Sequence, residues 1–314
     1  MATTYSSNDT QATHISQFDQ AHAGHKGELR EDFLQLTDDE LVFYKQITGI
    51  KDDAELIQHI VRMQAEAYQV FPYPCIRWFD FVRLRVSRFA VYYDLLKLGR
   101  EREGALYLDL GTCFGTAIRK PVLDGFPVKN CIGSDLRREF WDMGYQLCKD
   151  SPGVFPVPFV QGDVLDPSFL KPSAPIYTPL ESSKSNPELS SLTNLTPLTG
   201  RLSAIHASYF FHLFSEEKQL QIAQSLAGLL SPLPGSMIFG QHVAYTTKST
   251  IIIHPTGEPV PMFCHSPESW KELWNGTVFK KGSVKVEAEL STLPVPKGAL
   301  DHTYWQLVWS VTRL

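Results

Sequence analysis

The chain has 314 residues, of which 43% are hydrophobic and 20% are charged, as in an ordinary globular protein with a sizeable core. Its net charge of −5 disfavours nucleic-acid binding, which depends on a basic surface, and no stretch approaches the ~20 apolar residues that a membrane span requires. Five cysteines without a CxxC pair predict reduced thiols and no metal site. We therefore expect a cytoplasmic protein with neither a nucleic-acid nor a membrane partner.

The N-terminal third of the chain is polar at first and then helical in pattern. Residues 1–26 have no basic stretch or apolar run of the signal-peptide kind, and we expect a disordered tail. A capping box at residues 37–40 predicts one helix start, and Asp52 or Asp53 a second. Prolines in residues 71–74 break that second helix, and a long third helical pattern ends at Gly99, a plausible C-cap. Residues 27–100 are therefore predicted to form a helical cap.

From residue 101 onward, apolar strand patterns alternate with helical ones, which predicts one α/β domain over residues 101–314. We expect a doubly wound, mostly parallel sheet of seven strands. The strand patterns cover residues 105–110, 131–135, 158–163, 202–208, 235–243, 283–290 and 303–311. Residues 171–200 interrupt the alternation with five prolines and many Ser and Thr residues. They are predicted to be a surface insertion, with an active-site lid as the alternative.

Three acidic residues follow three successive strands. Asp109 precedes a turn with glycines at 111 and 115, where the missing Cβ atoms let a ligand approach the backbone. A carboxylate there would repel a phosphate but suits a ligand that carries an ammonium and a sulfonium group. Asp135 is placed to accept hydrogen bonds from ribose hydroxyls, and Asp163 from the exocyclic amine of adenine. The three acids together predict a site for an adenosine whose 5′ end carries a cationic amino acid.

On these residues the chain resembles the class I S-adenosylmethionine-dependent methyltransferases, over about residues 100–314. The resemblance implies a Rossmann-like fold, S-adenosylmethionine as cofactor and S-adenosylhomocysteine as product. Cys113 departs from the family pattern, because many members have a glycine there, and Pro121 lies within the expected helix of the first motif. The residues to which the resemblance gives a cofactor-binding role are Asp109, Gly111, Thr112, Gly115, Asp135, Leu136, Asp163, Val164 and Ala207.

A narrower resemblance, to fungal secondary-metabolite methyltransferases of the meroterpenoid type, rests on residues 207–214, 239–242, 265–270 and 304–311. It implies O-methylation of a carboxylate, or of a phenol or alcohol, on an aromatic or terpenoid small molecule. An alternative keeps the fold but catalyses a cyclisation or rearrangement, with the cofactor in a role other than methyl donor. We expect a monomer or a homodimer.

The residues after the fourth and fifth strands are expected to face the methyl group, because ligands bind beyond the carboxyl ends of parallel strands. His212 and His242 are the candidate catalytic residues, and Gln241 and His265 are candidate substrate contacts. For each of them a purely structural role is the alternative, and His206 is expected to be a buried core histidine.

Three residues of the cap complete the candidate substrate site. Tyr73 and Trp78 could stack on an apolar substrate, and Arg85, or else Arg77, Arg83 or Arg88, could pair with a carboxylate. The alternative is that the aromatic residues pack in the core of the cap and the arginine lies on a solvated face.

Overall fold

One large mixed sheet organises the structure. The computed structural model describes residues 27–179, 186–253, 259–299 and 304–314, so the predicted tail at 1–26 lies outside the described residues. Seven strands pair in the order β3-β2-β1-β4-β5-β9-β8; the first five are parallel, and β9 and β8 join antiparallel. The predicted doubly wound, mostly parallel seven-stranded sheet is confirmed. The strands are β1 (Leu106–Leu110), β2 (Cys131–Asp135), β3 (Phe159–Gln161), β4 (Leu202–His206), β5 (Met237–Ala244), β8 (Val284–Thr292) and β9 (Trp305–Arg313).

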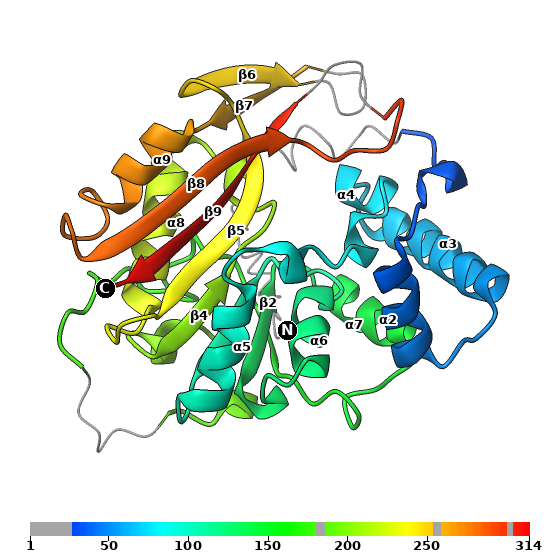
Figure 1. The fold of residues 1–314 in the computed structure, drawn as a ribbon, viewed down its shortest axis with the longest axis horizontal. Helices are drawn as coiled ribbons and strands as arrows, with labels where there is room; N and C mark the ends of the chain where they lie inside the picture. Colours follow the sequence, from blue (N-terminus) through cyan, green and yellow to red (C-terminus); the bar gives the residue numbers. More distant parts are fainter. Residues whose placement is uncertain (1–26, 180–185, 254–258, 300–303) are drawn as a thin grey trace, which may run out of the picture.

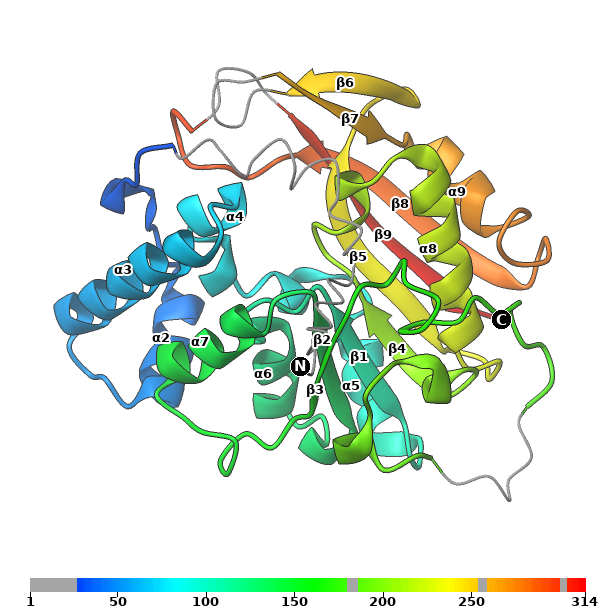
Figure 2. The ribbon, with the colours of Figure 1, turned by 180° about the vertical axis from the view of Figure 1, so that it is seen from behind.

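Helices cover both faces of this sheet, as Figures 1 and 2 show. On β1, Leu106 and Leu108 pack in the cluster that contains apolar residues of α8 and α9, whereas Tyr107 packs in the cluster that contains residues of α5 and α6. Burial on both faces explains why the parallel strands have apolar side chains at consecutive positions. The covering helices are α5 (Tyr92–Glu101), α6 (Thr116–Leu123) and α7 (Arg138–Cys148) on one face, and α8 (Glu216–Leu229) and α9 (Pro267–Trp274) on the other.

The N-terminal helices form the predicted cap. The capping box of α2 is confirmed, since the Thr37 backbone N–H donates to Glu40 Oε2 at 3.0 Å, and Asp52 caps α3 by accepting from the Glu55 N–H. The cap consists of η1 (Glu31–Phe33), α2 (Asp38–Thr48), α3 (Asp53–Val70), α4 (Pro74–Arg77), η2 (Asp80–Val82) and η3 (Arg85–Arg88).

The long third helix predicted up to Gly99 is wrong. Phe79 has a left-handed φ of 60°, which ends α4, and two short 3-10 turns follow before α5. Gly99 is no C-cap: it lies within α5, where a Cβ would stand 2.5 Å from the Phe126 ring. Glycine is needed there for close packing rather than for a turn.

The cap packs directly on the loop that follows β1. Phe81 stacks on Phe114 of that loop at 4.6 Å between ring centroids. Thr116, the first residue of α6, donates a hydrogen bond to the Phe81 carbonyl at 2.8 Å, and its hydroxyl lies 3.4 Å from the hydroxyl of Tyr44. The domain boundary near residue 100 stays a prediction, because residues on both sides of it share one apolar cluster.

Two further segments lie outside this plan. In the insertion at 171–200, Leu189, Leu195 and Leu198 are buried in the main core, and none of its described residues reaches the cavity described below. A hairpin that the sequence patterns did not indicate, β6 (Ser249–Ile253) and β7 (Val260–Cys264), stands beside the ends of β5, β8 and β9 (Figure 1). Within the described ranges, no helix is long and apolar enough to cross a bilayer, and no cluster of His, Cys, Asp or Glu could hold a metal ion.

Candidate active site

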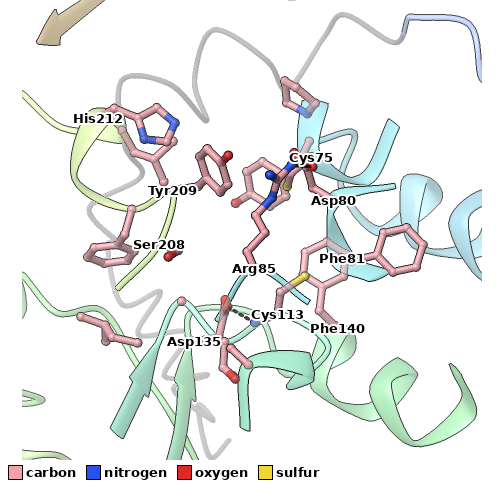
Figure 3. Close-up of a pocket in the computed structure, with 18 of the residues that line it drawn as sticks. Cys75, Asp80, Phe81, Arg85, Cys113, Asp135, Phe140, Ser208, Tyr209 and His212 are labelled. Atoms are coloured by element: carbon pink, nitrogen blue, oxygen red, sulfur yellow. Dashed lines mark hydrogen bonds and ion pairs between the residues drawn. The ribbon is translucent and has the colours of Figure 1, made fainter. Parts of the chain in front are cut away.

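A cavity of about 300 Å³ lies beyond the carboxyl ends of β1 to β4, below the cap. Its floor is made by the loop after β1 and by the residues that end β2 and follow β3. Figure 3 shows Asp135 and Cys113 at this floor, Cys75, Asp80 and Phe81 on the cap side, and Ser208, Tyr209 and His212 on the opposite side. The far wall is apolar and includes Ile253 and Met262 of the hairpin together with Val243, Leu293 and Tyr304.

The loop after β1 has a tight backbone that brings it close to this cavity. Gly111 has φ +71°, its N–H donates to the Ser134 carbonyl at 2.8 Å, and a Cβ there would lie 3.0 Å from the Phe210 ring. Cys113 adopts φ +51° and donates its N–H to Asp135 Oδ2 at 3.0 Å. Gly115, with φ +73°, packs against Trp141 instead of lining the cavity.

Two of the three predicted acids line the cavity. Asp135 accepts the N–H groups of Cys113 and Arg137, one on each oxygen, and burial raises the pKa of its carboxyl group. Asp163 accepts the Leu165 N–H on Oδ1 at 2.9 Å, while its buried Oδ2 meets no hydrogen-bond donor among the described residues. An exocyclic amine at this wall would supply that donor. Leu136 and Val164 line the cavity beside these acids, so the residues present fit an adenosine.

Asp109 is placed differently from the prediction. It is 1% exposed and does not line the cavity. Its Oδ1 lies 2.7 Å from His206 Nδ1, and its Oδ2 accepts the Thr112 hydroxyl at 2.6 Å. Both oxygens are therefore committed inside the protein, and the expectation that Asp109 itself meets a cationic ligand is corrected. Ala207 is also fully buried, with its carbonyl against Gly240 of β5.

The two candidate catalytic histidines separate in the structure. His212 lines the cavity, and burial lowers the pKa of its imidazole to about 3, so the ring is neutral and a weak base at pH 7. His242 does not line the cavity: its Nδ1 accepts the Trp309 indole N–H at 2.9 Å and its ring packs 4.6 Å from that of Trp270. Burial lowers the pKa of His242 well below its usual value. His242 therefore lies outside the candidate site, and nothing in this geometry supports the predicted catalytic role.

Two predicted substrate contacts are likewise structural. Gln241 is buried within β5, and its backbone carbonyl accepts the Tyr209 N–H at 2.6 Å. His265 bonds the Ser269 hydroxyl at 2.9 Å beside the N-terminus of α9, and burial lowers the pKa of its imidazole to about 4. Neither Gln241 nor His265 lines the cavity, so both substrate assignments are corrected.

The three cap residues do line the cavity, and Arg85 stands out among them. One of its terminal nitrogens donates to Asp80 Oδ1 and approaches the Pro294 carbonyl at 3.5 Å. Its guanidinium lies 5.4 Å from the centre of the Tyr209 ring. Its Nε is buried and meets no acceptor among the described residues. Asp80 raises the pKa of Arg85 against the effect of burial, so the guanidinium is charged.

Three residues directly after β4 belong to the site but were not among the individual site residues that the sequence predicted. Ser208, Tyr209 and Phe210 all line the cavity. Tyr209 adopts an unusual left-handed φ of 50° and donates its hydroxyl to Gln306 Oε1 at 2.9 Å. Backbone strain of this kind concentrates at functional sites. Two features of the sequence pointed to this segment: its position at a strand's carboxyl end, and its place within residues 207–214, which carry part of the narrower family resemblance.

The sequence is similar to those of known fungal methyltransferases. A model of the meroterpenoid methyltransferase N-terminal domain matches residues 29–82. The chain is 32% identical to methyltransferase ausD of Aspergillus calidoustus over 221 residues, which are 70% of this chain and 69% of that protein. The chain belongs to this family of fungal methyltransferases. It is also 32% identical to the asnovolin E/chermesin D methyltransferase nvfJ of Aspergillus novofumigatus, over 73% of this chain and 72% of that one. With O-methyltransferase atr3 of Stereocaulon alpinum it shares 29% identity, over 80% of this chain and 64% of that one.

The protein is thus a methyltransferase, and the family to which it belongs includes enzymes of fungal secondary metabolism. The matched N-terminal model covers the cap helices up to η2, and Tyr73, Trp78 and Phe81 from this segment line the cavity. The cap of the methyltransferase is therefore a family feature that contributes directly to the site.

Proposed function

We propose that the methyltransferase transfers the methyl group of S-adenosylmethionine to a carboxylate oxygen of a small aromatic or terpenoid natural product. The products would be a methyl ester and S-adenosylhomocysteine. In this proposal Asp163 and Asp135 hold the adenine amine and the ribose hydroxyls, and the methionine part extends over the Gly111 loop toward Ser208. The sulfonium methyl then faces the cap and the segment after β4.

Arg85 is the observation that carries the choice of a carboxylate. A guanidinium has five N–H donors on three nitrogens. In Arg85, only one of these nitrogens, a terminal one, has protein acceptors among the described residues. The other charged groups on this side of the cavity are Asp80, already paired with Arg85, and Arg83, paired with the Glu40 carboxylate at 3.0 Å. A substrate carboxylate would satisfy the remaining donors of Arg85 in a charge-assisted pair.

The chemistry of the cavity agrees with this choice. A carboxylate is ionised at pH 7 and needs no general base, whereas a phenol or alcohol benefits from one. His212, whose pKa burial lowers to about 3, is poorly suited to accept a proton at neutral pH. The contribution left to the protein is alignment of the nucleophile within about 3–3.5 Å of the methyl group, with water excluded.

The apolar far wall supports an aromatic or terpenoid body for the substrate. Val243, Ile253, Met262 and Leu293 bring no polar side-chain group other than a thioether to this end of the cavity. The names of two relatives point the same way: nvfJ is a methyltransferase for asnovolin E and chermesin D, and atr3 is an O-methyltransferase.

The test is a methylation assay with S-adenosylmethionine carrying a labelled methyl group. The acceptors are a panel of aromatic and terpenoid carboxylic acids, each with its primary amide and its reduced alcohol. We expect label only with the acids, in a product that mild alkali hydrolyses as a methyl ester. Label transferred equally to the alcohols, or a rearranged product without label, would contradict the proposal.

Variants of Arg85 then test the recognition step. Arg85→Gln should lower kcat/KM for the acid by roughly 10- to 150-fold, because a hydrogen bond to a charged group contributes about 1.5–3 kcal/mol. Arg88→Gln is the matched control, because Arg88 does not line the cavity and its hydrogen bonds go to the exposed Asp39 and Thr37, while its contact with the buried Glu40 is only 4.0 Å long. Equal effects of the two variants would show that Arg85 does not bind the carboxylate.

A further inference from the structure

Four side chains form one hydrogen-bonded chain between the loop after β1 and the segment after β4. The Thr112 hydroxyl donates to Asp109 Oδ2 at 2.6 Å, Asp109 Oδ1 lies 2.7 Å from His206 Nδ1, and His206 Nε2 lies 2.6 Å from the Ser208 hydroxyl. The two inner members are buried, with Asp109 1% and His206 5% exposed. The two outer residues, Thr112 and Ser208, both line the cavity.

With Asp109 ionised and His206 neutral, the direction of every hydrogen in the chain follows. An ionised carboxylate only accepts, so His206 carries its hydrogen on Nδ1 and donates it to Asp109. Its Nε2 is then an acceptor, and the Ser208 hydroxyl must donate to it. Thr112 likewise donates to Asp109. Both outer hydroxyl groups therefore donate their hydrogens within the protein, and only their oxygen lone pairs remain to accept a hydrogen bond from a ligand.

The order of the strands puts Thr112 and Ser208 next to the expected adenosine site. Asp163 follows β3 and Asp135 ends β2, and the sheet continues through β1 to β4. A ligand whose adenosine lies over β3 and β2 must therefore extend its amino-acid part over β1 and β4. Thr112 follows β1 and Ser208 follows β4, and Figure 3 shows Ser208 on the cavity wall above the floor that holds Asp135.

We propose that the oxygens of Thr112 and Ser208 bind the α-ammonium group of S-adenosylmethionine, and that the buried Asp109–His206 pair holds them as acceptors. An ammonium group offers three donors and no acceptor, which matches two hydroxyl oxygens that can only accept. Asp109 thus acts on the cationic ligand through the hydroxyl groups of Thr112 and Ser208 and does not contact it. His206 is a positioning residue in this arrangement. The proposal depends on the cofactor alone and not on which substrate atom is methylated.

The test is calorimetric binding of two ligands, with no methyl acceptor present. The first is S-adenosylhomocysteine, and the second is its analogue in which hydrogen replaces the α-amino group. Ser208→Ala should weaken binding of S-adenosylhomocysteine by about tenfold or more, the effect of losing one hydrogen bond to a charged group. It should change the affinity of the analogue less than about twofold. Thr112→Val should act in the same direction, and Thr112→Ser, which keeps the hydroxyl, should bind both ligands as the parent protein does.

His206→Phe separates the positioning role from simple packing. It removes the acceptor for Ser208, whose hydrogen can then turn into the cavity and repel the ammonium group, so the preference for S-adenosylhomocysteine over the analogue should shrink. If each variant weakens both ligands equally, the chain has only a structural role and the proposal is wrong. If Ser208→Ala leaves both affinities unchanged but lowers methyl transfer, the chain serves the reaction itself and the proposal is equally overturned. Failure of the carboxylate assay would change none of these binding results.

Discussion

Replacing Glu40 by glutamine should destabilise the protein and displace the two arginines of the cavity wall. The Glu40 side chain is 2% exposed, although it belongs to a helix on the surface of the cap. Its Oε2 accepts the Thr37 N–H and an Arg83 N–H, both at 3.0 Å, and its Oε1 accepts the Leu84 N–H at 3.2 Å. One carboxylate thus caps α2 and ties it to the segment that carries Arg83 and Arg85.

The size of the effect follows from these three bonds. Glutamine keeps one oxygen, and its amide NH₂ then faces groups that also donate. Removing one partner of a buried ion pair costs about 3–5 kcal/mol, and loss of the capping interaction about 1 kcal/mol. Arg83 is 18% exposed and regains some hydration, so we expect a net loss of about 2–3 kcal/mol. For a chain of this length that corresponds to a fall in Tm of about 3–5 °C.

The assay compares Glu40→Gln with Asp39→Asn in thermal and urea denaturation. Asp39 is the neighbouring acid on α2, and its ion pair with Arg88 joins two side chains that are each 53% exposed. An exposed pair contributes about 0–1 kcal/mol, so Asp39→Asn should shift Tm by at most about 2 °C. Glu40→Gln should also raise KM for a carboxylate substrate, because the segment with Arg85 loses its anchor. Equal stability of the two variants would refute the reasoning.

Three further predictions concern the cofactor loop and the effect of pH. An alanine Cβ at Gly144 of α7 would lie 2.3 Å from the Phe114 carbonyl oxygen. Gly144→Ala should therefore lower the free energy of unfolding by about 1–3 kcal/mol and weaken S-adenosylhomocysteine binding in calorimetry. The control Gly153→Ala, whose Cβ would have a side-chain oxygen at 3.7 Å as its nearest neighbour, should change neither. Because burial raises the pKa of Asp135, affinity for S-adenosylhomocysteine should fall on acidification at a higher pH than for an ordinary carboxylate, and Asp135→Asn should give a weak but flat profile. The pKa of an unfolded histidine is near 6.5, but burial lowers that of His212 to about 3, so the unfolded state takes up the proton first on acidification. The free energy of unfolding should therefore decline from about pH 6.5 toward pH 3, with about 2 kcal/mol lost through this residue at pH 5. In urea denaturation at decreasing pH, the midpoint should fall less steeply for His212→Gln than for the parent protein.

The sheet could be predicted because its strands carry their signal locally. The central parallel strands β1 and β4 are buried along their whole length, so their apolar runs are continuous, and the acids at 109, 135 and 163 lie at or just beyond strand ends. The segment between Ile76 and Gly99 carries no such signal. Its aromatic side chains, apart from the exposed Tyr93, are buried without a single helical face, and a left-handed residue at Phe79 divides the segment, so helical spacing was misleading.

The site was predictable in position but not in the direction of individual side chains. Asp135 and Asp163 line the cavity as their strand ends predict. Asp109 sits at an equivalent strand end, yet the register of β1 against β4 pairs it with His206, and that register exists only in three dimensions. His242 shows the same limit, since the indole of Trp309 on the neighbouring β9 takes up its ring nitrogen. Strand ends fix where a residue lies, while its pairing partner decides whether it faces the ligand.

Cys113, which departs from the family's first motif, allows the role of its backbone N–H to be separated from that of its thiol. Its left-handed φ of 51° costs a non-glycine residue about 1–2 kcal/mol, while glycine would add about 0.5–1 kcal/mol of chain entropy to the cost of folding and lose the packing of the thiol. Cys113→Gly should therefore change stability by less than about 1 kcal/mol. Its N–H can still donate to Asp135, so affinity for S-adenosylhomocysteine should stay within about threefold. Cys113→Val, branched at a position that disfavours it, should weaken both. A loss of affinity above tenfold in Cys113→Gly would show that the thiol itself, and not the backbone, contacts the cofactor.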